Sequence, residues 1–401
     1  MTADLLVSPR TDTRRVKVAV AAAGISSFAL LYAPQPVLPQ LADQYHLDPG
    51  SASLAISVAT GALAIAVLPI AALSEIVGRR PVIMTSVIVS AVLGLLLPLA
   101  PSYSVLLVLR VLQGIAIAGF PGVAAAYLVE QLGKTGVAAA VGAMIAGNSI
   151  GGMLGRLSAG FSADALGYHG ALVVVGIVGT IFSAITVLTL PPAPPREPAS
   201  EPLKKALRGV GAALGKPVLL AQYAVALLAM GAFVAMYNAA GFRLTGHPLD
   251  LSPAIASLVF LSYAMGSISS ATVGRLIGRF GRWKSAVGAL LVTAIGILLT
   301  LPDSLPVVII GFLVLTGGFF AAHAVANGWT AAEAPADARG QASGTYTLTY
   351  YLGSSVGGTA GSVIYAHAGW SWLSGATVLW LVLAMIVVIA MARPRRAAGA
   401  R

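Results

Sequence analysis

Two arginines stand inside long apolar segments, and their chemistry makes them the first candidates for a function. Arg110 lies three residues before Gln113, and Arg156 follows a run of glycines. A guanidinium offers five N–H donors, which suit carboxylates and other anions. In an apolar span this charge costs about 2.5–3.5 kcal/mol on insertion scales, so it is seldom present without a role. We predict a functional role for Arg110, with snorkelling to the nearer surface as the alternative. Arg156, which could pair with Asp43 or Asp164, is either part of an outer gate or an interfacial anchor.

Few titratable groups remain for proton transfer. His323 is the one histidine in an expected span, and imidazole titrates near physiological pH, so it is a candidate proton carrier. A hydrogen bond between His323 and a neighbouring helix explains its presence equally well. No expected span has Asp or Glu near its middle. If protons are coupled, the candidates are Asp43, Glu75 and His323, together with the arginines that tune them.

The composition requires that these side chains lie on membrane helices. Of 401 residues, 58% are hydrophobic and 9% are charged, whereas an average soluble domain has about 25% charged residues. The segments that lack charges give twelve spans, with eleven or thirteen as alternatives. We expect an all-α integral membrane protein with two six-helix bundles. Its expected parts are a tail at 1–17, a bundle at 18–190, a linker at 191–216, a bundle at 217–392 and a tail at 393–401.

The basic residues predict the orientation of these helices. The formal net charge is +11, and 21 of the 24 Lys and Arg residues fall on one side if the helices alternate. Since cytoplasmic loops retain Lys and Arg, both termini are expected in the cytoplasm, beside anionic lipids rather than nucleic acid. In the linker, apolar residues recur at helical spacing opposite Lys204 and Lys205, which indicates an amphipathic helix on the membrane surface. A flexible charged linker is an equal alternative.

The sequence also contains an internal repeat. Residues 147–155 (GNSIGGMLG) return at 353–361 (GSSVGGTAG), and residues 28–32 return at 233–237. Four such landmarks recur in the same order with offsets between 202 and 206 residues. Two bundles of equal orientation, related by a pseudo-two-fold axis along the membrane normal, would produce this pattern. In such folds the substrate site lies near the bilayer midplane between the repeats.

Two loop motifs carry a resemblance to a known family. Residues 71–80 (AALSEIVGRR) and 274–282 (GRLIGRFGR) supply glycine and arginine to tight turns between spans. Together with Arg110, Gln113 and the glycines on the fifth helix, they resemble the major facilitator superfamily, in particular its twelve-span drug:proton antiporter branch, which includes arabinose-efflux permeases. Ala71, Glu75 and Ile76 depart from the family's usual residues.

The resemblance implies roles for these motifs. In the family the acid of the first loop latches the inward gate, so Glu75, Arg79 and Arg80 are gating candidates, with Glu75 reaching an arginine and the start of the eleventh helix. The helix-four arginine, Arg110 here, is implicated in proton coupling. Close helix packing, and by resemblance an antiporter motif, is expected at Gly147, Gly151, Gly152, Gly155, Gly353, Gly357, Gly358 and Gly361.

By the same resemblance, helices one, four, seven and ten line the central cleft. Aromatic and amide side chains in an apolar wall suit a small organic molecule. The candidate substrate-binding residues on these helices are Tyr32, Gln35, Gln113, Tyr237, Asn238, Phe319, Phe320, His323 and Asn327.

These observations predict a monomeric secondary transporter of a bacterial-type inner membrane. We expect efflux of small organic molecules, such as drugs or sugars, in exchange for protons. An uptake symporter, a facilitative carrier, a channel and a non-transporting receptor remain as alternatives. No ATP-binding loop, catalytic dyad or metal-binding set is found in the sequence, and it has no cysteine, so we expect neither an enzyme nor a cofactor or metal.

Overall fold

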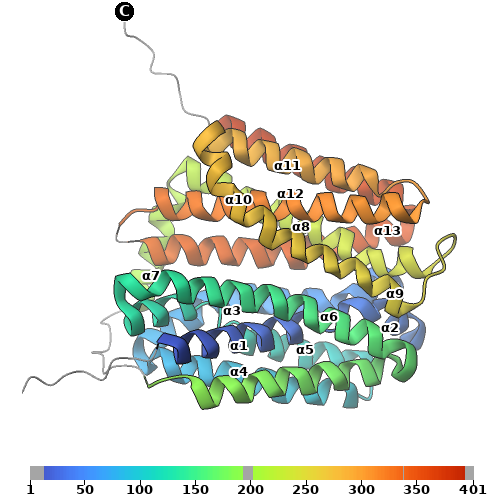
Figure 1. The fold of residues 1–401 in the computed structure, drawn as a ribbon, viewed down its shortest axis with the longest axis horizontal. Helices are drawn as coiled ribbons and strands as arrows, with labels where there is room; N and C mark the ends of the chain where they lie inside the picture. Colours follow the sequence, from blue (N-terminus) through green and yellow to red (C-terminus); the bar gives the residue numbers. More distant parts are fainter. Residues whose placement is uncertain (1–12, 193–201, 337, 393–401) are drawn as a thin grey trace, which may run out of the picture.

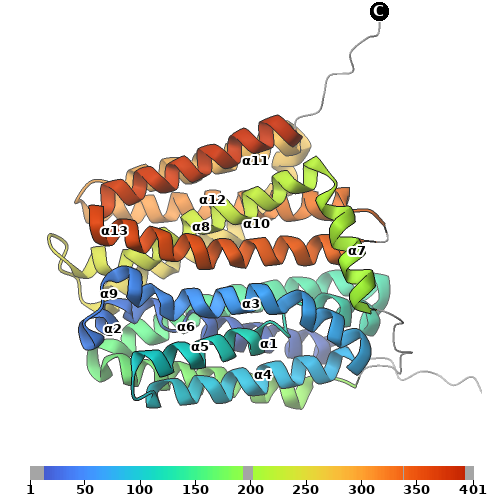
Figure 2. The same ribbon diagram turned by 180° about the vertical axis from the view of Figure 1, so that it is seen from behind.

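The computed structural model describes residues 13–192, 202–336 and 338–392, and these residues form helices without strands. The predicted tails therefore lie largely outside the described residues, although the first helix already begins at Thr13. The helices divide into two halves that lie side by side (Figures 1 and 2). The first half comprises α1 (Thr13–Tyr32), η1 (Gln35–Val37), α2 (Leu38–Tyr45), α3 (Pro49–Val77), α4 (Arg79–Leu96), η2 (Leu97–Leu99), α5 (Tyr103–Ile117) and α6 (Ala124–Thr189).

The second half repeats this plan after a short connecting helix. It comprises α8 (Pro217–Thr245), α9 (Pro253–Ser257), η3 (Leu258–Tyr263), α10 (Ala264–Phe280), α11 (Arg282–Leu299), α12 (Leu305–Glu333) and α13 (Arg339–Ala392), and the connecting helix is α7 (Pro202–Leu214). We call the end of the bundle where α7 lies the linker end, and the end that holds α2 and α9 the opposite end (Figure 1).

Two of the helices are too long to cross a membrane once. The helices α6 and α13 have 66 and 54 residues, or roughly 100 and 80 Å of helix at about 1.5 Å per residue. Gly167 in α6 and Gly369 in α13 have positive φ values of 63° and 79°, a conformation that glycine adopts without strain. The chain reverses in each of these helices (Figure 1).

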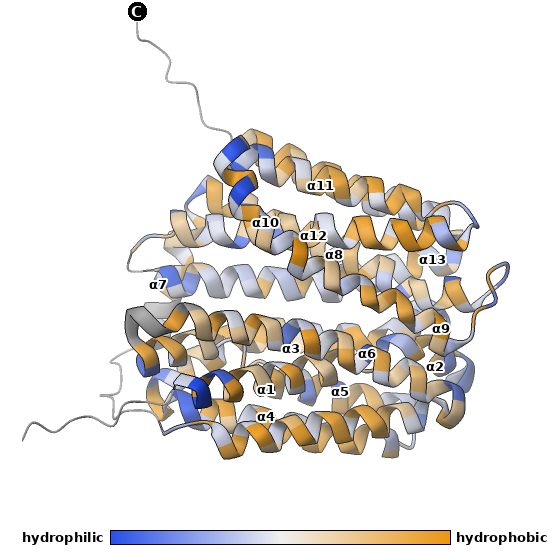
Figure 3. Cartoon of the chain, viewed as in Figure 1, coloured by the Kyte–Doolittle hydropathy of each residue, from blue (hydrophilic) through white to orange (hydrophobic). Residues whose placement is uncertain are grey.

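The helices are long and apolar enough to span a bilayer. Within the described residues, nine helical segments meet the length and hydropathy that a span needs, and Tyr103–Ile117 is a shorter apolar helix. If α6 and α13 each cross twice, these segments supply the expected twelve crossings. Hydrophilic residues concentrate near the helix ends, and apolar ones cover the helices between them (Figure 3). Lipid can solvate this apolar surface because helices satisfy their own backbone hydrogen bonds.

Caps and turns set the helix boundaries. Asp48 caps α3 by accepting hydrogen bonds from the backbone N–H and the hydroxyl of Ser51, and these bonds hold the pKa of Asp48 below its ordinary value. Gly78 and Gly281, with φ values of 93° and 76°, form the turns before α4 and α11. These two turns are the predicted loop motifs, and they occupy equivalent places in the two halves.

The two halves meet differently along their two contact lines. The helix α3 follows the first part of α13 along its length, from Gly50 beside Val363, through Gly61 beside Ser355, to Gly344 beside Leu68. The second line joins α6 to α9 and η3 at the opposite end, where the backbone N–H of Ala254 donates to Asp164. From there α10 diverges from α6 toward the linker end (Figure 1).

The connecting helix α7 favours the first of the two interpretations of the linker. Residues 202–214 are helical and run across the linker end (Figure 2). The apolar side chains of Leu207 and Leu214 are 65% and 45% exposed, as expected for a face that contacts lipid. The side chains of Lys204 and Lys205 lie outside the described part of the structure.

Candidate functional site

Arg110 on α5 is completely buried and bonded to backbone carbonyls of two other helices. Its Nε donates to the carbonyl of Ala55 on α3 over 2.7 Å. Its terminal nitrogens donate to the carbonyls of Leu30, over 3.0 Å, and Leu31 at the end of α1. Pro34 follows four residues after Leu30 and has no N–H to donate, so the guanidinium replaces a helical hydrogen bond that proline removes.

This geometry rules out snorkelling of Arg110 and places Gln113, whose role in substrate binding stays a prediction, inside the first half. Arg110 does not snorkel, because its side chain has no exposed surface. Gln113, which was expected to bind substrate, is also fully buried: its Oε1 accepts from Arg110 over 2.5 Å and its Nε2 donates to the carbonyl of Ser90 on α4. The pair therefore joins α1, α3, α4 and α5 inside the first half. A role of Arg110 in proton coupling stays a prediction.

Arg156 on α6 occupies the contact between the halves. Its Nε donates to Oε1 of Gln35 over 2.5 Å, and its Nη1 donates to the carbonyl of Gly152 over 2.7 Å. The guanidinium carbon lies 4.1 Å from the ring centre of Tyr32 and 4.4 Å from that of Tyr263 in η3. Phe260 completes the enclosure at 5.3 Å. Because Phe260 and Tyr263 belong to the second half, Arg156 links the two halves through cation–π contacts.

The expected ion pairs of Arg156 are wrong. Asp43 is exposed on α2, and Asp164 accepts a hydrogen bond from the backbone of Ala254. Arg156 is 1% exposed, and in the described part of the chain no carboxylate pairs with it. Its Nη2 has no acceptor there either, so a buried positive charge is left without an opposite charge.

Gln35 and Asn238 extend this cluster into α8. The Nε2 of Gln35 donates to Oδ1 of Asn238 over 2.7 Å, and both residues are buried. Asn238 Nδ2 is buried without a hydrogen-bond partner in the described structure. We call Tyr32, Gln35, Arg156, Asn238, Phe260 and Tyr263 the interface cluster. Tyr32, Gln35 and Asn238 were predicted from the sequence for substrate binding and Arg156 for gating, and the structure brings these four together.

Tyr237 lies beside the interface cluster but faces the interior of the second half. Its hydroxyl is 2.7 Å from Oγ1 of Thr316 on α12, and its ring packs between Phe260 and Phe312. The residue is completely buried. Its hydroxyl is therefore already hydrogen-bonded within the second half, and a role of Tyr237 in substrate binding stays a prediction.

His323 on α12 makes a hydrogen bond to a neighbouring helix, which was one of the two explanations given for this residue from the sequence. Its Nδ1 is 2.9 Å from the hydroxyl of Tyr346 on α13, and its ring centre lies 4.7 Å from that of Tyr350. Phe319, one turn earlier, stacks on Phe233 with ring centres 4.0 Å apart. These contacts form an aromatic layer between α8, α12 and α13. A role of His323 as proton carrier stays a prediction.

Two further predicted substrate-binding residues lie at the edges of this layer. Phe320 packs against Gly266 of α10 and edge-on to Tyr263, with ring centres 5.8 Å apart. It thus connects the aromatic layer to the interface cluster. Asn327 is exposed one turn beyond His323 and is not part of either group.

The loop residues form ion pairs at the linker end. Arg79 binds Glu75 over 2.7 Å and Glu130 of α6 over 3.2 Å. Arg80 donates instead to the carbonyl of Leu190 over 3.3 Å. The expected contact of Glu75 with the start of the eleventh helix stays a prediction.

Two carboxylates that take part in ion pairs at this end, Glu130 and Glu333, were not predicted from the sequence. Glu333 binds Arg282 over 3.2 Å, as Glu130 binds Arg79. Arg282 and Glu333 each lie 203 positions after their counterparts. This common offset was present in the sequence and is the signal that could have revealed them.

The two glycine series pack as predicted. A Cβ on Gly151 would lie 2.5 Å from the Cα of Ile25 on α1, and one on Gly155 would lie 2.5 Å from the Cα of Ala29. The backbone of α1 also blocks a side chain at Gly147. In the second half, α8 lies equally close to Gly353, Gly357 and Gly361. The second glycine of each pair lies beside a polar side chain, Gly152 beside Arg156 and Gly358 beside Asn238.

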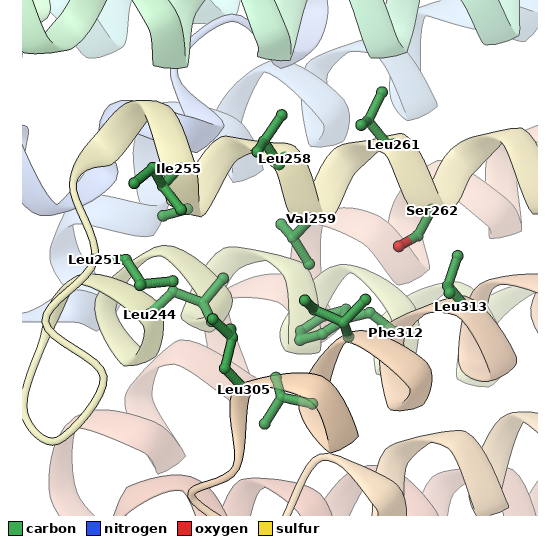
Figure 4. Close-up of a pocket in the computed structure, with 13 residues that line it drawn as sticks. Leu244, Leu251, Ile255, Leu258, Val259, Leu261, Ser262, Leu305, Phe312 and Leu313 are labelled. Carbon is green, nitrogen blue, oxygen red and sulfur yellow. The ribbon is translucent and has the colours of Figure 1, made fainter.

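An apolar cavity is lined by none of the residues of the interface cluster. It has a volume of about 280 Å³ and lies between the end of α8, α9, η3 and α12 (Figure 4). Its lining is aliphatic apart from Phe312 and Ser262, and it includes none of the predicted substrate-binding residues. With one hydroxyl, this cavity offers little to orient a polar molecule.

Comparisons with known proteins agree with this architecture. The family model described as Major Facilitator Superfamily matches residues 20–271 and 242–401. The chain is 35% identical over 372 residues to the MFS-type transporter YybF of Bacillus subtilis, which covers 93% of this chain and 92% of the relative. It is 36% identical over 378 residues to the inner membrane transport protein YnfM of Escherichia coli, covering 93% and 89%.

The fold is also found in a solved structure. The crystal structure of a bacterial homologue of the human lysosomal transporter Spinster, inward-facing and unoccupied, superimposes with a TM-score of 0.80 at 17% identity. The match covers 98% of this chain and all of the other. The apolar helices, the duplicated halves and the match to the family model lead to one conclusion: the chain is a multi-pass integral membrane protein and belongs to the major facilitator superfamily of transporters.

Proposed function

We propose that this transporter exports small organic molecules in exchange for protons, by alternating access between its two halves. The interface cluster is the observation that carries the proposal. It unites polar and aromatic groups from α1, η1 and α6 of the first half with groups from α8 and η3 of the second. A molecule bound there would contact both halves, so its binding energy would depend on how the halves are arranged.

We further propose that the protein lies in a bacterial-type inner membrane, with its linker end and both termini on the cytoplasmic side. We also propose that it is a monomer. The described linker end holds the basic pairs of the two loop motifs, as the positive-inside rule expects. The E. coli relative is named an inner membrane protein, which supports the same location. The tail, bundle and linker boundaries at 1–17, 18–190, 191–216, 217–392 and 393–401 remain part of this proposal.

Transport by purified protein in liposomes tests the proposal. Vesicles with an imposed pH difference receive labelled compounds from several classes, including an aromatic carboxylate, a pentose and a lipophilic dye. We expect uphill movement of one class against the proton flux, abolished when a protonophore dissipates the pH difference. Uphill movement in the same direction as the protons would identify a symporter. Downhill movement that the pH difference does not affect would identify a facilitative carrier or a channel. If no class of compound moves, the protein would be a receptor.

A further inference from the structure

The two buried arginines of the first half differ in how their donors are used. Arg110 makes four hydrogen bonds, to the carbonyls of Leu30, Leu31 and Ala55 and to Gln113. Arg156 makes two, to Gln35 and to a carbonyl on its own helix. A guanidinium has five N–H donors. Arg156 therefore keeps donors available at the contact between the halves, whereas those of Arg110 are almost all used.

The charge of Arg156 is also uncompensated. Throughout the described residues, every Asp and Glu lies within the first or last two turns of a helix or in a loop, except Asp164, which lies three residues before the reversal of α6 at Gly167. A partly buried arginine, Arg243, shows the usual solution: it stacks on Trp370 at 4.8 Å and also binds Asp303 over 3.2 Å. Arg156 has the aromatic contacts, but no carboxylate of the described residues binds it.

Other polar atoms in and near the interface cluster also lack partners in the described structure. Asn238 Nδ2 and Ser57 Oγ are both buried and unbonded. Both lie near Gly358, since a Cβ there would be 3.0 Å from the amide nitrogen and 3.7 Å from the hydroxyl. Buried donors are nearly always hydrogen-bonded in proteins. The unused donors of Arg156 and Asn238 therefore point to an acceptor that binds between the halves.

We propose that the interface cluster binds organic monoanions, specifically carboxylates that carry an aromatic or similarly flat apolar body. This inference rests on the proposed function as a transporter and adds the substrate class. Guanidinium and amide donors match the two oxygens of a carboxylate. The rings of Tyr32, Phe260 and Tyr263 provide flat apolar surfaces beside it.

The number of charges selects a monoanion over a phosphate-like dianion. Arg156 is the one positive charge in the interface cluster, and Arg110 is committed to carbonyls and Gln113. A dianion would keep one negative charge buried and unpaired, which is costly in a low dielectric. A neutral amide of the same shape would leave the charge of Arg156 unpaired, and an aromatic cation would be repelled.

Binding to the purified full-length protein tests this proposal without any gradient. The probes are benzoate, benzamide and benzylammonium, which share a ring and differ in charge, and the readout is titration calorimetry. We expect benzoate to bind at least tenfold more tightly than the other two. Equal or stronger binding of benzamide or benzylammonium would overturn the proposal.

Variants identify the residue responsible. Arg156→Gln should weaken benzoate binding at least tenfold, whereas the matched change Arg243→Gln, at an arginine outside the interface cluster, should leave it within twofold. Asn238→Asp, which adds a negative charge beside Gln35, should also abolish benzoate binding and is decisive if Arg156→Gln does not fold. Unchanged affinity in Asn238→Asp or in a folded Arg156→Gln would refute the assignment.

The outcome is separable from that of the proposed function. Selective benzoate binding without proton-driven transport would retain the substrate class and reject proton-coupled export. Proton-driven transport of a sugar or dye, with no benzoate binding, would retain export and reject the substrate class.

Discussion

At the scale of single residues, the cost of a buried charge explains why Arg110 is where it is. Pro34 has no N–H for the carbonyl of Leu30, and α1 ends at Tyr32, so the carbonyls of Leu30 and Leu31 lack their usual helical partners. The guanidinium supplies donors to them and gains the favourable field of a helix C-terminus. Its charge is thus stabilised by oriented carbonyl dipoles rather than by an acid.

We predict that Arg110→Ala lowers the stability of the protein. The carbonyls of Leu30 and Leu31 would lose their donor, at a cost of roughly 2–6 kcal/mol at about 1–3 kcal/mol for each unsatisfied group. Thermal melting in detergent measures the effect, and transport should fall in parallel. Arg110→Lys, which keeps the charge but not the planar set of donors, should be intermediate.

The exposed Arg208 of α7 provides the control for this prediction. Arg208→Ala should melt within experimental error of the unmodified protein. If Arg110→Ala also melts unchanged, the hydrogen bonds described for Arg110 do not stabilise the fold.

At the scale of helices, close approach of backbones replaces the hydrophobic effect, which does not drive association between helices in lipid. Gly147, Gly151 and Gly155 place α6 directly against α1. The corresponding glycines of α13 face Leu227, Gly231 and Ala235 of α8. Each glycine and its partner recur at the same offset of 206 residues, so the repeat preserves the helix pair rather than only the motif.

We predict that Gly151→Val disrupts this helix pair, because its Cβ would be 2.5 Å from the backbone of Ile25. Overpacking of this kind costs about 1–3 kcal/mol. Gly142→Val on the same helix is the control, since nothing lies within 4 Å of a Cβ there. Melting temperatures in detergent should fall for the first variant and stay constant for the second; equal behaviour of the two would argue against the predicted packing.

At the scale of the whole molecule, duplication gives each half its own ion pair at the linker end. Arg79 with Glu130 and Arg282 with Glu333 occupy equivalent positions. The halves can therefore keep their internal contacts while they move relative to each other. In the proposed alternating access, the contacts that would change lie between the halves: along α3 and α13, in the interface cluster, and between Asp164 and Ala254.

The absence of cysteine from the sequence allows a clean test of the orientation. Ser304→Cys places a thiol at the opposite end and Ala212→Cys places one on α7, and both positions are exposed. We expect a membrane-impermeant maleimide to label Ser304→Cys in intact cells, and Ala212→Cys only after lysis. The reverse pattern would place the linker end outside and refute the proposed topology.

Particular residues show how far the sequence could predict the candidate site. Arg156 and Gln35 were recognisable because a polar group in an apolar span is costly and therefore conspicuous. Phe260 and Tyr263 were not, since aromatic residues are common in membrane helices and nothing local marks the two that enclose a guanidinium. Glu130 and Glu333 lie near helix ends, where acids are ordinary.

The sequence by itself determined the membrane class, the helices, the duplicated plan and the glycines that pack them, because hydrophobicity, charge and spacing are properties of short segments. Only the tertiary structure decided which side chains meet: that Arg110 binds carbonyls, that Gln113 lies inside the first half, and that Arg156 is surrounded by rings, with no acid from the described residues beside it. The physical reason is that a helix in lipid is apolar on all sides. Its sequence therefore does not show which face turns toward lipid and which toward its neighbours.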